Sequence, residues 1–440
     1  MNTEQARAFR IIAKHSQSPS NEPLKMYIGG PGGTGKSRVI DSLREYFTRS
    51  GQQRQFRLAS YTGVAATNIA GMTLHAALCL NQRNHKKGSS KTTQDLISMW
   101  QEVDYLFIDE ISMIGCSLLL QISEALGEAK GNTLPFGNIN IILAGDFCQL
   151  PPIGQTRLFT KLDTSSYESA SKRGQNDILG KLLWLSISTV VIFQDIMRQK
   201  GKDNVPFVEL LNRLREGRCI DKDFDLLNKR IINNVLIDWK SFRDVPIIVS
   251  DNVTKDAINV KATEAFAKRS GQDLHWYYAT DTRGGKKIDD TELENHLLDL
   301  NSGQTNQRLG KIPLVIGMPI IVTQNFDVNG GIVNGTMGIL KQICYYTDNQ
   351  DRRHAVSCIV ESPTIKGTPL PNLSQYEGAI LEDTVDMNFI HPFSKKKCVI
   401  KRTQVPLAPT FAMTTYKAQG RTLQTAIVDL QSCKGQRLHT

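Results

Sequence analysis

The 440-residue sequence lacks several features that would assign a protein to a specialised class. It has no run of about 18 consecutive apolar residues, so no membrane-spanning helix is expected. It opens with polar residues rather than a signal peptide, which predicts an intracellular protein. None of its eight cysteines forms a C-x₂-C pair, which argues against a zinc site and a disulfide framework. There is no internal repeat and no low-complexity tail.

The composition is that of an ordinary globular protein, 40% hydrophobic and 22% charged. At about 150 residues per domain, the length predicts about three domains. The formal net charge of +10 favours a polyanionic partner, but it fits a solvated basic surface equally well. Charge alone therefore does not decide between the two readings.

Residues 1–190 alternate strand-like and helix-like stretches, which predicts β-α-β units and a parallel sheet covered by helices. The expected strands are Met26–Ile28, Phe56–Ser60, Leu106–Ile108, Ile139–Leu143 and Val190–Phe193. The polar, basic segment 81–93 is expected to be a short loop or hairpin between two of these strands. Ligands are expected at the carboxyl ends of the strands.

A second β-α pattern begins near residue 191, with a helix at Phe207–Arg215 and a strand at Pro246–Ser250. Residues 271–311 are polar and contain glycine. Residues 312–400 are rich in β-branched residues and turns, which predicts an all-β insert. The α/β pattern resumes over 401–440, so the second domain is predicted to be discontinuous, made of 191–311 and 401–440.

Residues Gly30 to Ser37 read Gly-Pro-Gly-Gly-Thr-Gly-Lys-Ser, the G-x-x-x-x-G-K-[ST] pattern of a phosphate loop. An apolar run precedes the loop and helix-like residues follow it, which is the context that this motif requires. Backbone N–H groups and the helix N-terminus can surround a polyphosphate, while the lysine and serine reach the terminal phosphates and Mg²⁺. The predicted ligands are Gly30, Gly33, Thr34, Gly35, Lys36 and Ser37. The sequence therefore predicts a bound nucleoside triphosphate.

Two further strands end in polar residues. Leu106–Ile108 leads into Asp109 and Glu110, a Walker B arrangement in which Asp109 would hold Mg²⁺ and Glu110 would polarise the attacking water. Ile141–Leu143 leads to Gln149, whose amide could bond the γ-phosphate and report its loss. Each pattern alone is also compatible with an ordinary strand and turn.

Together these motifs resemble the petite-integration-frequency (Pif) family of superfamily-one DNA helicases. The matching segments occur in the family's order and span nearly the whole chain. They are Asn2–Gln5, Gly30–Ser37, Tyr61–Ala66, Thr73–His75, Asp109–Met113, Pro135–Gly137, Gly145–Pro152, Met197–Gln199, Asn325, Val333–Thr336 and Thr414–Thr422. The combination is far more specific than the phosphate loop alone.

The resemblance implies two RecA-like α/β domains with a small SH3-like β insert in the second. It implies an ATP-dependent motor that moves 5′→3′ on single-stranded DNA and unwinds duplex or forked DNA, with ATP and Mg²⁺ as cofactors and roles in repair and recombination. The insert would clamp the strand and the 81–93 loop would act as a duplex wedge. A chain that is monomeric when free is expected, in the nucleus or alternatively the mitochondrion of a eukaryote.

Carried over by residue, Gln5 resembles the glutamine that reads adenine, and Arg198 an arginine finger supplied by the second domain. Gly420 would bring backbone close to the nucleotide. Exposed surface residues are the plain alternative for Gln5 and Arg198.

The resemblance also implies a set of contacts to single-stranded DNA, in which short polar side chains and N–H groups bind phosphates and position a strand without reading its sequence, and Pro151 offers apolar surface. They are Thr62, Gly63, Asn68, Thr73, His75, Pro151, Asn325, Asn334, Thr415, Lys417 and Gln419. His75 could equally be a core histidine. The aromatic residues Tyr61, Phe147 and Tyr416 fit the core at least as well as a base-stacking surface.

The sequence departs from the family pattern near its end. The family's last motif is a strand followed by Ser-Arg, whereas here Ile427–Leu430 is followed by no such pair, and Arg437 lacks the strand and serine. We expect an excised helicase core or a natural fragment, in which ATP turnover is in question. Tyr416 and the segment 428–435 look more like the helicase portion of Helitron-type transposons.

Two alternatives to a complete motor follow from this departure. One is a nucleotide-gated protein that binds single-stranded DNA with little or no turnover. The other is a subunit of a RecD-like nuclease complex, which predicts a partner chain.

Overall fold

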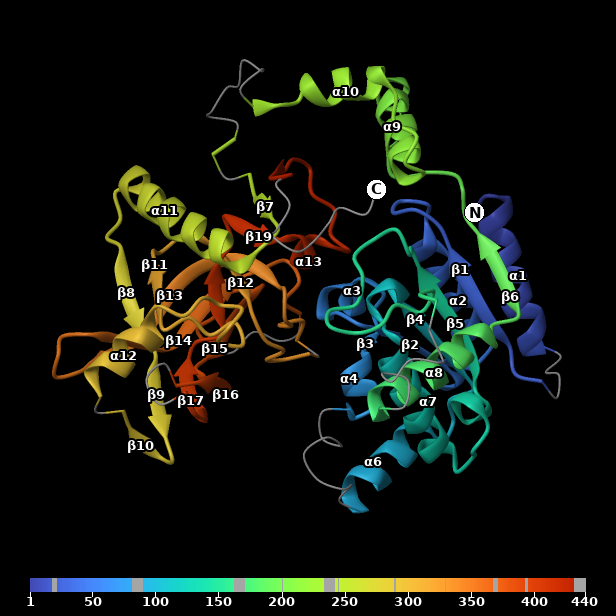
Figure 1. Cartoon of the computed structure of the whole chain (residues 1–440), viewed down its shortest axis with the longest axis horizontal. Helices are drawn as coiled ribbons and strands as arrows, with labels where there is room; N and C mark the ends of the chain where they lie inside the picture. Colours follow the sequence, from blue (N-terminus) through green and yellow to red (C-terminus); the bar gives the residue numbers. More distant parts are fainter. Residues whose placement is uncertain are drawn as a thin grey trace. The chain divides into compact units, whose positions relative to one another are not determined.

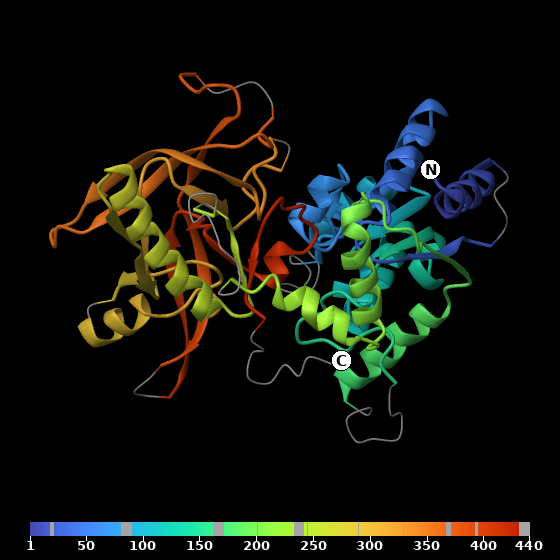
Figure 2. The same cartoon turned by 90° about the horizontal axis from the view of Figure 1, so that it is seen from above.

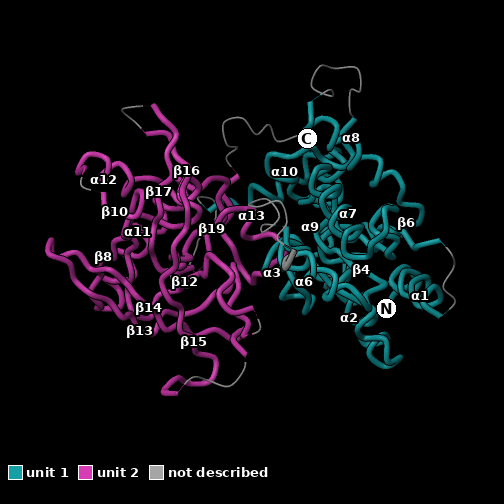
Figure 3. The backbone as a smooth tube through the Cα atoms, turned by 90° about the horizontal axis from the view of Figure 1, so that it is seen from below, with its two compact units in different colours: residues 1–235, 440 teal, residues 236–439 magenta. Residues whose placement is uncertain are grey.

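The structure is a computed structural model that describes residues 1–17, 22–80, 90–161, 171–199, 201–232, 242–243, 245–288, 290–328, 330–366, 371–391 and 395–430. The chain divides into two compact units, residues 1–235 with residue 440 (unit 1) and residues 236–439 (unit 2) (Figure 3). No described helix is both long and apolar enough to cross a bilayer.

Unit 1 contains one parallel sheet of six strands in the order β3-β2-β4-β5-β1-β6 (Figure 1). The strands are β1 (Lys25–Gly29), β2 (Phe56–Ser60), β3 (Met72–Thr73), β4 (Tyr105–Asp109), β5 (Asn140–Gly145) and β6 (Thr189–Ile192). The five strands predicted for this region are confirmed to within two residues. The two-residue strand β3 is too short to produce a sequence pattern.

Helices cover both faces of this sheet. They are α1 (Thr3–Gln17), α2 (Lys36–Arg49), α3 (Gly63–Asn68), α4 (Leu74–Ala77), α6 (Ser90–Trp100), α7 (Cys116–Lys130) and α8 (Lys172–Leu185). Strand β4 shows how the sequence builds two cores, because its neighbouring side chains point to opposite faces. Tyr105 and Phe107 pack in a core with α1 and α2, whereas Leu106 and Ile108 pack in a core with α4, α6 and α7. A parallel sheet buried on both sides explains the nearly continuous apolar runs.

The loop expected at 81–93 is described only in part. Residues 81–89 lie outside the described residues, and residues 90–93 are not a loop because they form the first turn of α6. This helix buries Leu96 and Trp100, and the Trp100 indole donates to the carbonyl of Ala77 (2.8 Å). The wedge role stays a prediction.

Two helices follow β6, α9 (Val205–Arg215) and α10 (Asp221–Asn228), and they meet at a corner (Figures 1 and 2). We call residues 205–228 the elbow. The sequence ended the first domain at residue 190, but residues 191–235 group with unit 1. The reason is local: the N–H groups of Met197 and Arg198 donate to the carbonyl of Gly33 (2.8 and 3.1 Å), and Arg215 pairs with Asp146.

Unit 2 contains a small parallel sheet in the order β19-β7-β20. Its strands come from both sides of the β-rich region in sequence. They are β7 (Ile247–Val249), β19 (Ala412–Thr414) and β20 (Ile427–Val428), accompanied by α11 (Asn252–Ser270) and α13 (Thr415–Ala418). Arg437 lies outside the described residues.

The β-rich region consists of two further sheets and one helix. One sheet has the order β11-β8-β14-β13-β12-β18, with β15 paired to β14, and the other has the order β10-β9-β17-β16. The elements are β8 (His275–Tyr278), β9 (Thr280–Arg283), β10 (Lys286–Lys287), α12 (Thr291–Leu298), β11 (Lys311–Leu314), β12 (Pro319–Val322), β13 (Met337–Thr347), β14 (Arg353–Glu361), β15 (Glu377–Leu381), β16 (Asp383–Ile390), β17 (Lys397–Gln404) and β18 (Leu407–Pro409).

This region is wider than the predicted insert of 312–400, since its strands run from His275 to Pro409. Strands β8 to β10 were missed because they are short, partly exposed and rich in polar residues, so they show little apolar alternation. The predicted α/β fold class with an added β-rich part is confirmed. The SH3-like character of the insert stays a prediction.

Candidate nucleotide and nucleic-acid sites

The three nucleotide motifs of unit 1 lie at one edge of the sheet. Strands β4, β5 and β1 are consecutive neighbours, and all run in the same direction. The Asp109–Glu110 pair, residues 146–149 and the phosphate loop therefore follow the carboxyl ends of three adjacent strands. This edge is where parallel α/β sheets bind ligands.

The phosphate loop connects β1 to α2 through backbone that favours glycine. Gly33 has φ of 86°, and a Cβ added there would come within 2.8 Å of the Cβ of Arg198. Gly35, also at positive φ, is the residue before the first turn of α2. Thr34 is fully buried and its hydroxyl donates to the carbonyl of Pro31 (2.9 Å). The loop thus has the geometry that places N–H groups at a helix N-terminus.

Lys36 is folded back onto its own loop. Its Nζ donates to the carbonyls of Gly30 (2.8 Å) and Pro31 (3.1 Å). Burial lowers the pKa of Lys36, and the carboxylates of Asp109, Asp146 and Glu110 oppose that shift. A cation held among acidic groups in this way is suited to an incoming triphosphate.

Gln5 lies against the loop rather than in solvent. Its Nε2 donates to the carbonyl of Thr34 (2.9 Å) and its Oε1 accepts from the N–H of Asn2 (3.0 Å), and the side chain is buried. The surface-residue alternative for Gln5 is therefore wrong. Its adenine-reading role stays a prediction, since both ends of the amide also bond within the protein.

The turn after β4 places two carboxyl groups, Asp109 and Glu110, next to each other. Burial raises the pKa of Asp109 to about 7, and the neighbouring Glu110 carboxylate adds to the shift. Glu110 has φ of 59°, a region that is costly for a residue with a side chain and is common at functional sites. A buried carboxylate and the Ser37 hydroxyl are hard oxygen donors, so the residues present fit Mg²⁺.

Gln149 is oriented by a residue that the sequence analysis missed, Asp146. The Gln149 N–H donates to the Asp146 carbonyl (2.9 Å) and its Nε2 to the Asp146 carboxylate (3.3 Å). The same Nε2 lies beside the phosphate loop, 3.4 Å from where a Cβ on Gly32 would be.

Arg215, at the end of α9, was also missed. It donates two hydrogen bonds to the buried Asp146 carboxylate (2.6 and 2.7 Å). The sequence shows that Asp146 follows a buried strand, where a carboxylate needs a cation as partner. It gives no sign that this partner is Arg215, 69 residues away.

Arg198 was predicted to reach the site from the second domain, whereas the structure groups it with the residues of unit 1. It belongs to unit 1, where its N–H bonds the carbonyl of Gly33 and its side chain is exposed. Its role as an arginine finger stays a prediction.

The DNA-contact candidates of unit 1 follow β2 and β3, at the same edge of the sheet. Thr62 and Thr73 begin short helices, and their hydroxyls accept from the N–H groups of Ala65 (3.2 Å) and Ala76 (3.3 Å). Gly63 and Asn68 are the first and last residues of α3. These positions leave helix N-termini at the edge.

His75, Phe147 and Pro151 are all half-buried, but their neighbours differ. His75 is half-buried beside Tyr61 (5.9 Å between ring centroids), and burial lowers its pKa. Phe147 is partly buried and packs against Tyr27 at the margin of a core cluster (5.4 Å between ring centroids), and its base-stacking role stays a prediction. Pro151 is half-buried.

In unit 2 the structure brings three candidates together. The N–H of Asn334 donates to Asn325 Oδ1 (2.9 Å), and Lys417 Nζ donates to Asn334 Oδ1. Arg421, which the sequence analysis missed, donates to the carbonyls of Lys417 (2.7 Å) and Gly335 (2.6 Å). We call Asn325, Asn334, Lys417 and Arg421 the lysine cluster.

The other three candidates of unit 2 are continuous with this cluster. Thr415 begins α13 at the carboxyl end of β19, and Gln419 closes it by donating its N–H to the Thr415 carbonyl (3.0 Å). Gly420 has φ of 77°, as its predicted tight turn requires. Its approach to the nucleotide stays a prediction.

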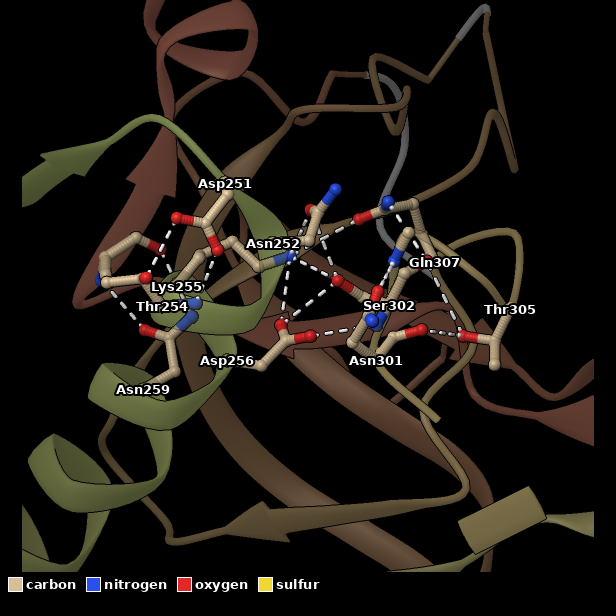
Figure 4. A network of polar contacts seen from close by, with 12 residues as sticks. Asp251, Asn252, Thr254, Lys255, Asp256, Asn259, Asn301, Ser302, Thr305 and Gln307 are labelled. Carbon is tan, nitrogen blue, oxygen red and sulfur yellow. Dashed lines mark hydrogen bonds and ion pairs between the residues drawn. The ribbon is translucent and has the colours of Figure 1, made fainter. Parts of the chain in front are cut away.

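A buried lysine supports this part of unit 2. Figure 4 shows Lys255, in the first turns of α11, donating to Ser302 Oγ (2.7 Å) and Asn252 Oδ1 (3.2 Å) and pairing with Asp256 (3.1 Å). The network fixes residues 301–307 against α11.

The pKa of Lys417 is lowered to about 8. Burial is the main cause, and the positive charges of Arg421 and Lys255 add to the shift.

Comparison with known proteins shows which proteins this chain resembles. The family profile described as "PIF1-like helicase" matches residues 1–225. The ATP-dependent DNA helicase PIF1 of Saccharomyces cerevisiae is 26% identical over 71% of this chain and 33% of its own length. The PIF1 helicase of Candida albicans is 23% identical over 93% of this chain and 50% of its own length. The chain therefore spans a third to a half of these relatives.

The fold also matches a solved structure. A Bacteroides Pif1 helicase in complex with ADP-AlF3 and single-stranded DNA aligns with a TM-score of 0.65 at 20% identity, covering 97% of this chain and 86% of that one. At this identity the likeness shows the fold. With a family profile that covers more than half of its length, the chain belongs to the PIF1-like helicase family.

Proposed function

We propose that this chain is an ATP-dependent DNA helicase that binds and hydrolyses ATP at the carboxyl edge of the unit 1 sheet and translocates on single-stranded DNA. The observation that carries the proposal is the convergence of Lys36, the Asp109–Glu110 pair and Gln149 at the ends of three adjacent strands. Family membership and the named activities of its relatives support it.

Each residue at this edge has a defined task. Lys36 leaves its loop carbonyls to meet the terminal phosphates, and Glu110 accepts a proton from the attacking water. Gln149 lies where it can bond the γ-phosphate. Ser37 and Asp109 would hold Mg²⁺, which when bound would neutralise part of the phosphate charge.

The finer features remain part of the proposal. They are 5′→3′ travel, unwinding of duplex or forked DNA, an arginine finger at Arg198, phosphate contacts at Thr62, Gly63, Asn68, Thr73 and His75, and an apolar contact to DNA at Pro151. In unit 2 the contacts are the lysine cluster with Thr415 and Gln419. The DNA-bound state of the Bacteroides Pif1 supports a DNA partner. We place the protein inside the cell.

The test is DNA-stimulated ATP hydrolysis by the purified chain, with Glu110→Gln as the matched control. Removal of a general base lowers turnover about 100-fold or more, so only the wild type is expected to show a rate that rises with single-stranded DNA. A wild-type rate no higher than that of Glu110→Gln would overturn the motor and leave a nucleotide-gated binding protein.

Direction needs a second substrate pair. Strand displacement is compared on partial duplexes with a 5′ or a 3′ single-stranded tail. Displacement of the 5′-tailed duplex alone is expected, and preference for the 3′ tail would contradict the proposed direction.

A further inference from the structure

The last residue of α9 reaches the turn that carries Gln149. Arg215 Nη1 and Nη2 donate to the two carboxylate oxygens of Asp146 (2.7 and 2.6 Å). The N–H of Cys148 (3.0 Å) and the amide of Gln149 (3.3 Å) donate to the same carboxylate. Asp146 is only 2% exposed. One buried carboxylate is therefore shared between the turn and the helix.

The two helices of the elbow are joined by an ion pair and bury few side chains. Arg213 donates to both oxygens of Asp223 in α10 (2.9 and 2.7 Å), which ties the two helices together. Among the described residues of α9 and α10, only Leu210 and Asp223 are buried. The bidentate Arg215–Asp146 pair is thus a specific anchor for an element with little apolar attachment.

The anchor lies close to the phosphate loop. Gln149 Nε2 lies 3.4 Å from where a Cβ on Gly32 would be. Arg215 also offsets a carboxylate that would otherwise repel a triphosphate. If the turn that carries Gln149 moves when the terminal phosphate is lost, the Arg215–Asp146 pair transmits this movement to α9.

We propose that Arg215 is a positioning residue of the ATP site. Its ion pair with Asp146 holds the Gln149 side chain toward the terminal phosphate and makes the elbow move together with the turn that carries Gln149. The elbow precedes unit 2 in the chain, and unit 2 begins at residue 236. The inference rests on the proposed function, because it requires a nucleotide on the loop.

Two variants test the Arg215–Asp146 pair without leaving a buried charge unpaired. Arg215→Lys keeps the charge and loses the bidentate geometry, and the double variant Asp146→Asn with Arg215→Met removes both charges. Arg218→Ala is the control, because Arg218 is 79% exposed and pairs with the exposed Glu216.

The first readout is steady-state ATP hydrolysis with saturating single-stranded DNA. Misplacement of a catalytic group lowers kcat, so we expect about a tenfold loss in both variants with KM for ATP changed less than about threefold. A merely structural role would lower the melting temperature and leave kcat of the folded protein unchanged. Wild-type kcat in either folded variant would overturn the inference.

The second readout does not need turnover. Hydrogen exchange in α9 is compared with and without a non-hydrolysable ATP analogue. Exchange is expected to slow in the wild type and in Arg218→Ala, and to stay unchanged in the two test variants. If the wild type binds the analogue and α9 does not respond, the inference fails and the proposed function stands. If the wild type binds no analogue, the proposed function fails.

Discussion

The nucleotide edge of unit 1 and the lysine cluster of unit 2 each hold a half-buried lysine, but the two sites balance its charge differently. At the nucleotide edge Lys36 lies among Asp109, Glu110 and Asp146. In the lysine cluster, Lys417 bonds an amide oxygen, and its pKa is lowered by burial and by other cations.

The difference indicates two kinds of polyanion site. Unit 1 has a cation and acidic groups together, which suits a phosphate that arrives with a divalent metal. The lysine cluster has positive charge bonded to neutral groups, which suits metal-free backbone phosphates. The predictions below are designed to separate these two sites.

The largest expected effect is that of Lys36→Ala. Loss of a charge-stabilising donor to the terminal phosphates should lower kcat about 100-fold or more. Affinity for single-stranded DNA without nucleotide should stay within about twofold, since the change lies at the nucleotide site. Fluorescence titration and ATPase assays measure the two. Arg49→Ala is the control at the exposed end of α2, and a parallel loss of DNA affinity in Lys36→Ala would break the separation.

Asp109→Asn should change the metal requirement. A carboxylate that holds Mg²⁺ directly or through water affects metal affinity about 10- to 100-fold, so half-maximal hydrolysis should need that much more Mg²⁺. The measurement is the ATPase rate as a function of Mg²⁺ at fixed ATP. The exposed Asp104, at the other end of the same sheet, gives the control Asp104→Asn. An unchanged Mg²⁺ dependence would show that Asp109 does not hold the metal.

Lys417→Ala should weaken DNA binding and leave ATP binding intact. Loss of one phosphate contact lowers affinity across sequences and reduces the slope of log affinity against log salt by about one. Wild-type affinity should itself fall about tenfold or more between roughly 50 and 200 mM salt. Lys261→Ala, on the exposed face of α11, is the control. An unchanged salt slope in Lys417→Ala would place the DNA elsewhere.

The smallest effect is on pH dependence. Because the pKa of Lys417 is about 8, its positive charge is present at pH 7 and is lost as pH rises through 8. DNA affinity should therefore fall a few-fold by pH 9 in the wild type and less in Lys417→Arg, which keeps its charge. Identical pH profiles would show that Lys417 does not contact phosphate.

The same shift has the opposite effect on stability. Between about 8 and the ordinary lysine value of 10.5, the unfolded chain binds more protons than the folded chain. The contribution of Lys417 to the free energy of unfolding therefore rises with pH in this window. Denaturant unfolding at pH 7.5 and 9.5, compared with Lys417→Arg, isolates this contribution.

The sequence predicted the parts of the molecule in which local pattern and tertiary structure agree. The five strands of unit 1 and the phosphate loop are local features, since an apolar run and a glycine spacing determine them. The boundaries of the β-rich region were missed because β8 to β10 have too little apolar alternation to register.

Contacts between distant residues could not be predicted in the same way. The pairing of Asp146 with Arg215 and the bonds of Arg421 to Gly335 and Lys417 join segments brought together only by the fold. The grouping of residues 191–235 with unit 1 was not predicted, because the backbone bonds that hold Arg198 to Gly33 leave no sequence signal.

The link between the two sites is tested most directly by the rate of ATP hydrolysis as a function of single-stranded DNA concentration, in the wild type and in Lys417→Ala. The account predicts a DNA-stimulated rate in both, with the same maximum and with half-saturation at a higher DNA concentration in Lys417→Ala. A wild-type rate that does not respond to DNA, or identical half-saturation in the two proteins, would contradict it.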